Sequence, residues 1–120
     1  MEIVKGVYGL DSILESVKKT LGIYPDDTAF NDELIIHINS VFMILQQLGI
    51  GTADGFSISG STETWSQFVS DSSHTELVKS YIYVKVRMLF DPPQNSALIE
   101  AMNEQAAEFE WRLAVKGEMV

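Results

Sequence analysis

Residues 31–48 read NDELIIHINSVFMILQQL, and this stretch decides the fold. Its apolar side chains recur at intervals of three and four residues, the spacing of one helix face; they are Leu34, Ile38, Val41, Leu45 and Leu48. Ile35, Phe42 and Ile44 widen this stripe beyond what a helix with one solvent-exposed side requires. We therefore predict a helix over 31–48, ended by Gly49, that lies at the centre of the domain.

Capping signals predict a shorter helix before it, over 12–21. Ser12 is a typical N-cap residue, and Glu15 follows three residues later, as in a capping box. Gly22 suits the left-handed conformation that ends many helices. A helix this short needs a packing partner to be stable.

The stretch 49–60 contains four glycines in twelve residues, which rules out a continued helix. Phe56 and Ile58 alternate with Ser57 and Ser59 there. This alternation is compatible with either a short strand or an ordered loop. It is the one candidate for β structure in the sequence.

Three more helices are expected after this stretch: a short one over 62–69, one from Thr75 to Phe90 that follows a polar turn over 70–74, and a last one over about 93–114. The run Asp91-Pro92-Pro93-Gln94 stops one helix and can start the next, with Asp91 as N-cap. The last helix is expected to point five side chains inward: Leu98, Met102, Ala106, Phe109 and Leu113. The predicted fold class is all-α, a compact bundle of about four to five helices with one Gly-rich loop that can hold a short strand.

Length and composition limit the functions that the chain can have. With 120 residues and 46% hydrophobic content, we expect a single domain over 1–120. The absence of cysteine excludes disulfides, iron–sulfur clusters and thiolate zinc sites. A formal net charge of −9 argues against non-specific binding to nucleic acid. Neither an apolar run long enough to span a bilayer nor a secretory signal is visible, so we expect a cytoplasmic origin and no membrane partner.

No constellation of residues predicts catalysis, a cofactor or a metal ion. His37 follows Glu33 by four residues, but no second histidine stands at ligand spacing. His74 lacks the serine motif of a hydrolase. The acidic segment 26–33 places Phe30 where a calcium loop needs glycine, and the glycine-rich stretch carries no basic residue for a phosphate. We therefore expect a protein that is not an enzyme.

Two groups of residues remain as candidates for interaction. The first is the acidic stripe, which we define as Glu100, Glu104 and Glu108, at four-residue spacing on the last helix. Such a stripe is typical of a solvated helix face, and the functional alternative is a surface that faces a channel or a basic partner. The second group is expected at a partner interface, because large amphipathic side chains dominate such interfaces: Trp111, Arg112, Phe56, Ile58 and Tyr83.

An ordered series of segments resembles the head-tail connector proteins of tailed bacteriophages, also called head-completion or adaptor proteins. The segments are 11–19 (DSILESVKK) with 21–23 (LGI), 34–40 (LIIHINS), 47–49 (QLG), 63–65 (ETW), 78–93 (VKSYIYVKVRMLFDPP) and 108–113 (EFEWRL). The resemblance extends over nearly the whole chain and is most specific over 87–93. It brings no catalytic residues with it.

The resemblance implies a helical protomer that forms a homo-oligomeric ring, expected to be twelve-fold, under the portal protein of the capsid. The ring joins the portal to a stopper or tail-completion protein and extends the channel through which DNA passes without specific binding. The protein is then expected at the head–tail interface of the virion, and in the bacterial host cytoplasm before assembly. In this reading the acidic stripe lines the channel. The alternative is a small acidic phage-encoded regulator or inhibitor that binds a basic host protein.

Overall fold

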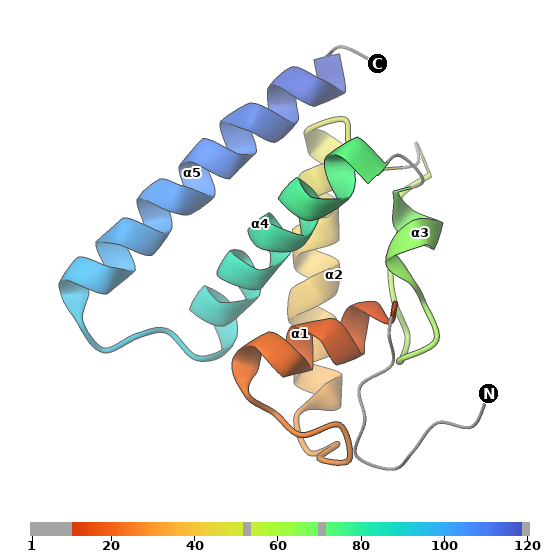
Figure 1. Cartoon of the computed structure of the whole chain (residues 1–120), viewed down its shortest axis with the longest axis vertical. Helices are drawn as coiled ribbons and strands as arrows, with labels where there is room; N and C mark the ends of the chain where they lie inside the picture. The colour runs from red at the N-terminus through yellow and green to blue at the C-terminus, as the bar shows by residue number, and fades with distance from the viewer. Residues whose placement is uncertain (1–10, 52–53, 70–71, 119–120) are drawn as a thin grey trace.

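Five helices make up the fold in the computed structural model, which describes residues 11–51, 54–69 and 72–118. They are α1 (Ile13–Leu21), α2 (Asn31–Gln47), α3 (Trp65–Phe68), α4 (Ser72–Phe90) and α5 (Ser96–Glu118). Figure 1 shows α4 between α2 and α5, with α1 across the lower part of the bundle. No sheet is present in the described part of the chain, so the prediction of an all-α fold is confirmed.

The buried core lies where α1, α2 and α4 meet. The predicted face of α2 supplies Leu34, Ile38, Val41 and Leu45, none of them accessible to solvent. The helix nevertheless has one solvent-exposed side, although its broad apolar stripe predicted a central position, because α1, α4 and the following loop cover only part of its circumference. The part of α5 whose side chains are described buries only Ala106 and Leu113, both against the α4 side of the bundle.

Helix α1 is held by its caps, as predicted. The Ser12 hydroxyl accepts a hydrogen bond from the Glu15 backbone N–H at 3.2 Å, and Gly22 ends the helix with φ of 77°. The complete capping box is found at α3 instead, where Thr64 and Gln67 exchange bonds. This local arrangement makes a four-residue helix possible.

The first turns of α1 and α3 are tied to each other. The Ile13 N–H donates to the Glu63 carbonyl at 3.1 Å, and the Trp65 N–H donates to the Asp11 carbonyl at the same distance. The Trp65 indole N–H also donates to the Ser16 hydroxyl at 2.9 Å. Backbone N–H groups that a helix end leaves unpaired are thus satisfied by a second helix end.

The loop before α3 is ordered without forming a strand. The Asn39 side chain on α2 accepts a bond from the Ile58 N–H at 2.8 Å and donates to the Ile58 carbonyl at 3.0 Å. Phe56 packs against Phe42 and Phe68. Of our two alternatives for this stretch, the ordered loop is therefore correct for residues 54–60, because a side chain of α2 replaces the neighbouring strand.

Two helix starts differ from prediction. Helix α4 begins at Ser72, so residues 72–74 belong to the helix rather than to a polar turn; residues 70 and 71 lie outside the described part. Helix α5 begins at Ser96, because the Asn95 side chain caps the N–H groups of Ala97 and Leu98 at 2.8 and 3.2 Å. The predicted cap, Asp91, instead donates its N–H to the Arg87 carbonyl and extends the end of α4.

Leu98 is the one predicted inward residue of α5 that lies on the surface, with 49% of its area exposed. Figure 1 shows the first turns of α5 reaching past the end of α4, so that no neighbouring helix covers this position.

Within the described residues, no helix is long and apolar enough to cross a membrane.

Candidate interaction surfaces

The outer face of α5 carries both the acidic stripe and Trp111. All three glutamates of the stripe are exposed, and Trp111 exposes 68% of its area. Trp111 follows Glu104 by seven residues, close to two full helical turns, so both side chains point to the same side. Buried Ala106 and Leu113 lie on the opposite side. The two groups that the sequence suggested for different roles therefore form one continuous surface.

Glu108 and Glu110 of α5 have partners on different helices. Glu108 of the stripe pairs with Arg112 one turn later at 2.8 Å, and both side chains remain more than half exposed. Glu110 faces α4, where it accepts a hydrogen bond from the Tyr81 hydroxyl at 2.9 Å and lies 4.0 Å from the Lys85 ammonium group. Burial, together with the nearby Glu110 carboxylate, raises the pKa of Tyr81 far above its usual value. Glu110 thus fastens α5 to α4 and is not part of the exposed stripe.

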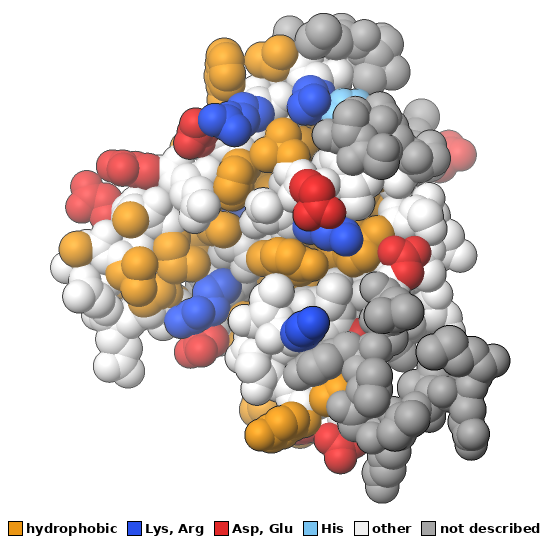
Figure 2. All heavy atoms as spheres, in the orientation of Figure 1, with side chains coloured by type: hydrophobic (Ala, Val, Ile, Leu, Met, Phe, Trp, Pro, Cys, Tyr) orange, Lys and Arg blue, Asp and Glu red, His pale blue; other side chains and the backbone are white. Residues whose placement is uncertain are grey.

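An open groove of about 560 Å³ lies between the start of α4 and the end of α5. It is lined by Glu76, Leu77, Ser80, Trp111, Arg112, Val115 and Lys116. Figure 2 shows this side of the molecule, where basic side chains stand beside hydrophobic ones near the top of the view. The groove is therefore apolar inside with cations at its edge, a combination that suits an acidic, partly apolar partner.

The other predicted interface residues do not lie with Trp111 and Arg112. Ile58 is 3% exposed and lies in the core, so it offers no surface contact in this conformation. Phe56 is half-buried beside Phe42 and Phe68. Tyr83 is half-buried with its ring edge-on to Trp65, 6.1 Å between centroids, and it lines a small pocket between α1, α4 and α5.

Burial raises the pKa of Tyr83, a hydrogen bond with Ser16 lowers it, and the nearby Glu76 carboxylate raises it, with a net increase. The structure therefore gives this tyrosine a packing role against α1 and α3.

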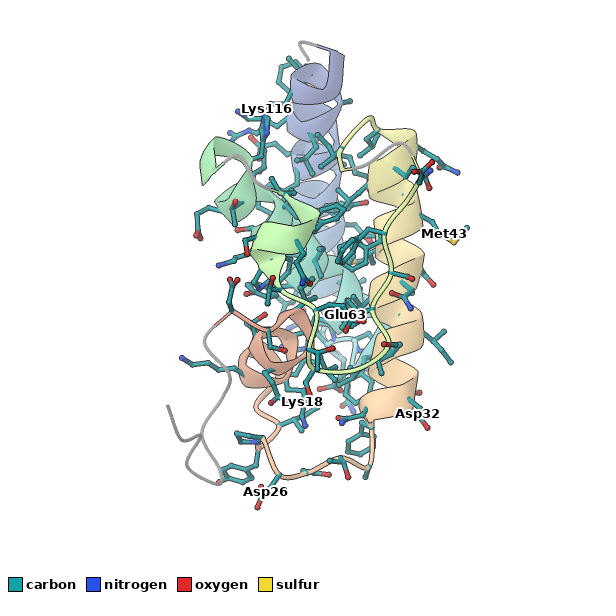
Figure 3. All side chains as sticks on the ribbon, turned by 90° about the vertical axis from the view of Figure 1, so that its right-hand side faces the viewer. Lys18, Asp26, Asp32, Met43, Glu63 and Lys116 are labelled. Carbon is teal, nitrogen blue, oxygen red and sulfur yellow. The ribbon has the colours of Figure 1, made fainter. Side chains whose placement is uncertain are left out.

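A second exposed apolar surface lies on the outer side of α2. Ile36 and Met43 expose 65% and 64% of their areas, and they are seven residues apart on one face. Figure 3 shows Met43 and Asp32 pointing away from the bundle on this side. Sequence reasoning missed this surface because the broad apolar stripe of α2 predicted a central position in the domain.

The described residues contain no group of three or more histidine or acidic side chains that could hold a metal ion. The Glu63 carboxylate accepts bonds from the Ser59 N–H at 2.9 Å, the Ser59 hydroxyl at 2.8 Å and the Gly60 N–H at 3.3 Å. Partial burial works to raise the pKa of Glu63, but these bonds outweigh it and hold the pKa below its usual value. This carboxylate is used to fix the loop before α3.

Comparison with known proteins identifies one family. The model of a family described as phage connector protein matches residues 13–120, which include all five helices. No curated protein and no solved structure gives a significant match.

Proposed function

The chain belongs to the phage connector protein family, and from this membership we propose that it forms a ring adaptor between the portal and the tail or stopper protein. Members of the family are structural connectors of the phage particle and not enzymes. The finer proposal is that the ring, expected to be twelve-fold, extends the channel for DNA and that the protein resides at the head–tail interface of the virion. The portal and a stopper or tail-completion protein are the proposed partners.

The exposed face of α5 is the observation that carries the channel part of the proposal. It presents three glutamates at four-residue spacing, of which only Glu108 forms an ion pair with another described residue. A wall of negative charge repels the phosphates of passing DNA, so that the DNA slides without adhering. In the assembled ring the acidic stripe of this face would point to the lumen, and its C-terminal end at Trp111 would border the neighbouring subunit.

The assembly is tested by mixing the purified chain with the portal protein of the same phage and imaging the product by electron microscopy. We expect a ring stacked coaxially on the portal. Absence of any association, in the presence of portal-bearing capsids, would contradict the proposal. A monomer that instead binds basic host proteins would support the alternative of an acidic inhibitor.

The lumen position of the acidic stripe is tested with a single introduced thiol, since the chain has no cysteine of its own. The variant Glu104→Cys is expected to react with both a small maleimide and a large polyethylene glycol maleimide when free. Once assembled on the portal, it should react with the small reagent only, because the lumen excludes the large one. Equal reaction with both reagents after assembly would place the stripe on the outside of the ring.

A further inference from the structure

Charge is unevenly distributed along this chain. No lysine or arginine occurs from Thr20 to Val78, a stretch that contains eight acidic residues. Five of the eight basic residues follow between Lys79 and Lys116, on α4 and α5. Helix α2 therefore carries acidic side chains and no Lys or Arg, whereas α4 and α5 together carry most of the basic side chains.

The outer face of α2 combines this acidic character with exposed apolar groups. One row of its exposed positions follows spacings of three and four residues: Asp32, Ile36, Ser40, Met43 and Gln47. Glu33 lies at the edge of this row, and neither Asp32 nor Glu33 forms an ion pair with another described residue. Both carboxylates already favour the start of the helix through its dipole, and both remain open to a cation from outside.

The groove between α4 and α5 offers the complementary combination. Leu77, Trp111 and Val115 supply apolar area, and Arg112 and Lys116 supply positive charge. Two of its charged groups are satisfied internally by the pairs Glu76–Lys79 and Glu108–Arg112, at 3.8 and 2.8 Å. Lys116 forms no ion pair with another described side chain and is left for a partner.

The two surfaces lie on opposite sides of the molecule. In Figure 3, Met43 and Asp32 point to the right of the view and Lys116 points to the left. Surfaces placed in this way cannot meet within one molecule, but they can meet between successive copies. Repeated contacts between two different surfaces give a closed ring when the rotation closes.

Resting on the proposed function, we propose that the ring is built head to tail, with the outer face of α2 of one copy seated in the α4–α5 groove of the next. The Asp32 and Glu33 carboxylates then lie near Lys116, and Ile36 and Met43 contact Trp111 and Val115. A symmetric contact of α2 with α2 is disfavoured, because that helix offers only negative charge to its copy.

Cross-linking between the two surfaces tests this arrangement directly. The double variant Met43→Cys/Trp111→Cys is treated with a short bis-maleimide, both in concentrated solution and together with the portal. We expect a ladder of covalently linked dimers, trimers and larger species on a denaturing gel. The matched control Ile36→Cys/Met43→Cys carries both thiols on the α2 face and is expected to give no ladder.

Charge reversal adds a second readout. Lys116→Glu in the cross-linking variant should reduce the ladder several-fold, and adding Asp32→Lys should restore it. Equal ladders from the test and control variants, or no ladder from either, would overturn the head-to-tail contact. Stacking of the wild-type ring on the portal is scored separately by imaging. If the ring stacks on the portal but the variant gives no ladder, this inference alone is refuted. If the ladder forms but no ring stacks on the portal, the adaptor function alone is refuted.

Discussion

The double hydrogen bond between Asn39 and Ile58 leads to a prediction about stability. Substituting Asn39→Ala removes one bond of 2.8 Å and one of 3.0 Å. Each bond contributes on the order of 1 kcal/mol, and a buried polar group left unpaired adds to the loss. Because Ile58 is 3% exposed, water reaches its backbone groups poorly. The expected loss is about 2–3 kcal/mol of unfolding free energy, or roughly 10 °C in Tm.

Urea denaturation followed by circular dichroism measures this loss, and two control variants bracket it. Asn39→Asp keeps the acceptor for the Ile58 N–H but turns a second carboxylate oxygen toward the Ile58 carbonyl, so it should lose at least half as much stability. Ser40→Ala removes only an exposed bond to the Ile36 carbonyl, and it should cost less than about 0.5 kcal/mol. If Asn39→Ala stayed within about 0.5 kcal/mol of the wild type, the side chain would not be what fixes the loop.

Three further predictions concern α5, a turn glycine and a buried tyrosine. Replacing all three glutamates of the acidic stripe by glutamine should change the unfolding free energy by less than about 0.5 kcal/mol, since two like-charge pairs and one ion pair are removed together. The variant should still form a ring on the portal. If sedimentation showed that the ring no longer forms, the stripe would be an interface. Gly51→Ala should cost over about 2 kcal/mol in urea, because φ is 95° and the new Cβ would lie 2.6 Å from the packed Phe68 ring. Gly22→Ala, with φ of 77° and open space, should cost only about 1 kcal/mol, and equal costs would disprove the clash. The raised pKa of Tyr81 favours the neutral phenol in the folded state, so wild-type stability should fall as the pH rises above 10.0, the pKa of the unfolded tyrosine. In thermal melts at a series of pH values, Tyr81→Phe should show a shallower fall.

Helix ends that depend on neighbouring residues were predictable, and ends that depend on the tertiary fold were not. Ser12 and Gly22 define α1 through bonds within one turn, and the sequence predicts both. At the start of α5, Asp91 and Asn95 are equally good caps by residue type. The structure uses Asn95, because Asp91 continues the end of α4.

The loop before α3 shows a different limit of sequence reasoning. The alternation of Phe56 and Ile58 with serines left a strand and a loop equally open. The partner that decides between them is Asn39, nineteen residues earlier on α2, and no local pattern indicates this pairing. The exposed side of α2 was missed for a related reason, since coverage of a helix depends on its neighbours.

The candidate surfaces were predictable in part. Seven residues separate Glu104 from Trp111, so helix geometry alone places the acidic stripe and the tryptophan on one face. The groove could not be predicted, because it needs Leu77 and Trp111, 34 residues apart, to approach each other from two packed helices, and no local pattern indicates their crossing. The burial of Ile58 could not be predicted, because it depends on the same long-range contact with α2.

The sparse packing of α5 links folding to assembly. This helix contacts mainly α4, and among its described side chains only Ala106 and Leu113 are buried. Segments with so little burial open more readily than the core, so α5 is expected to open at a lower free energy than α2 and α4. A neighbouring subunit that covers Trp111 and Val115 binds only the form in which α5 is packed on α4, and it therefore stabilises this packed form by mass action. Ring closure and the ordering of α5 are then one coupled equilibrium, in which each strengthens the other.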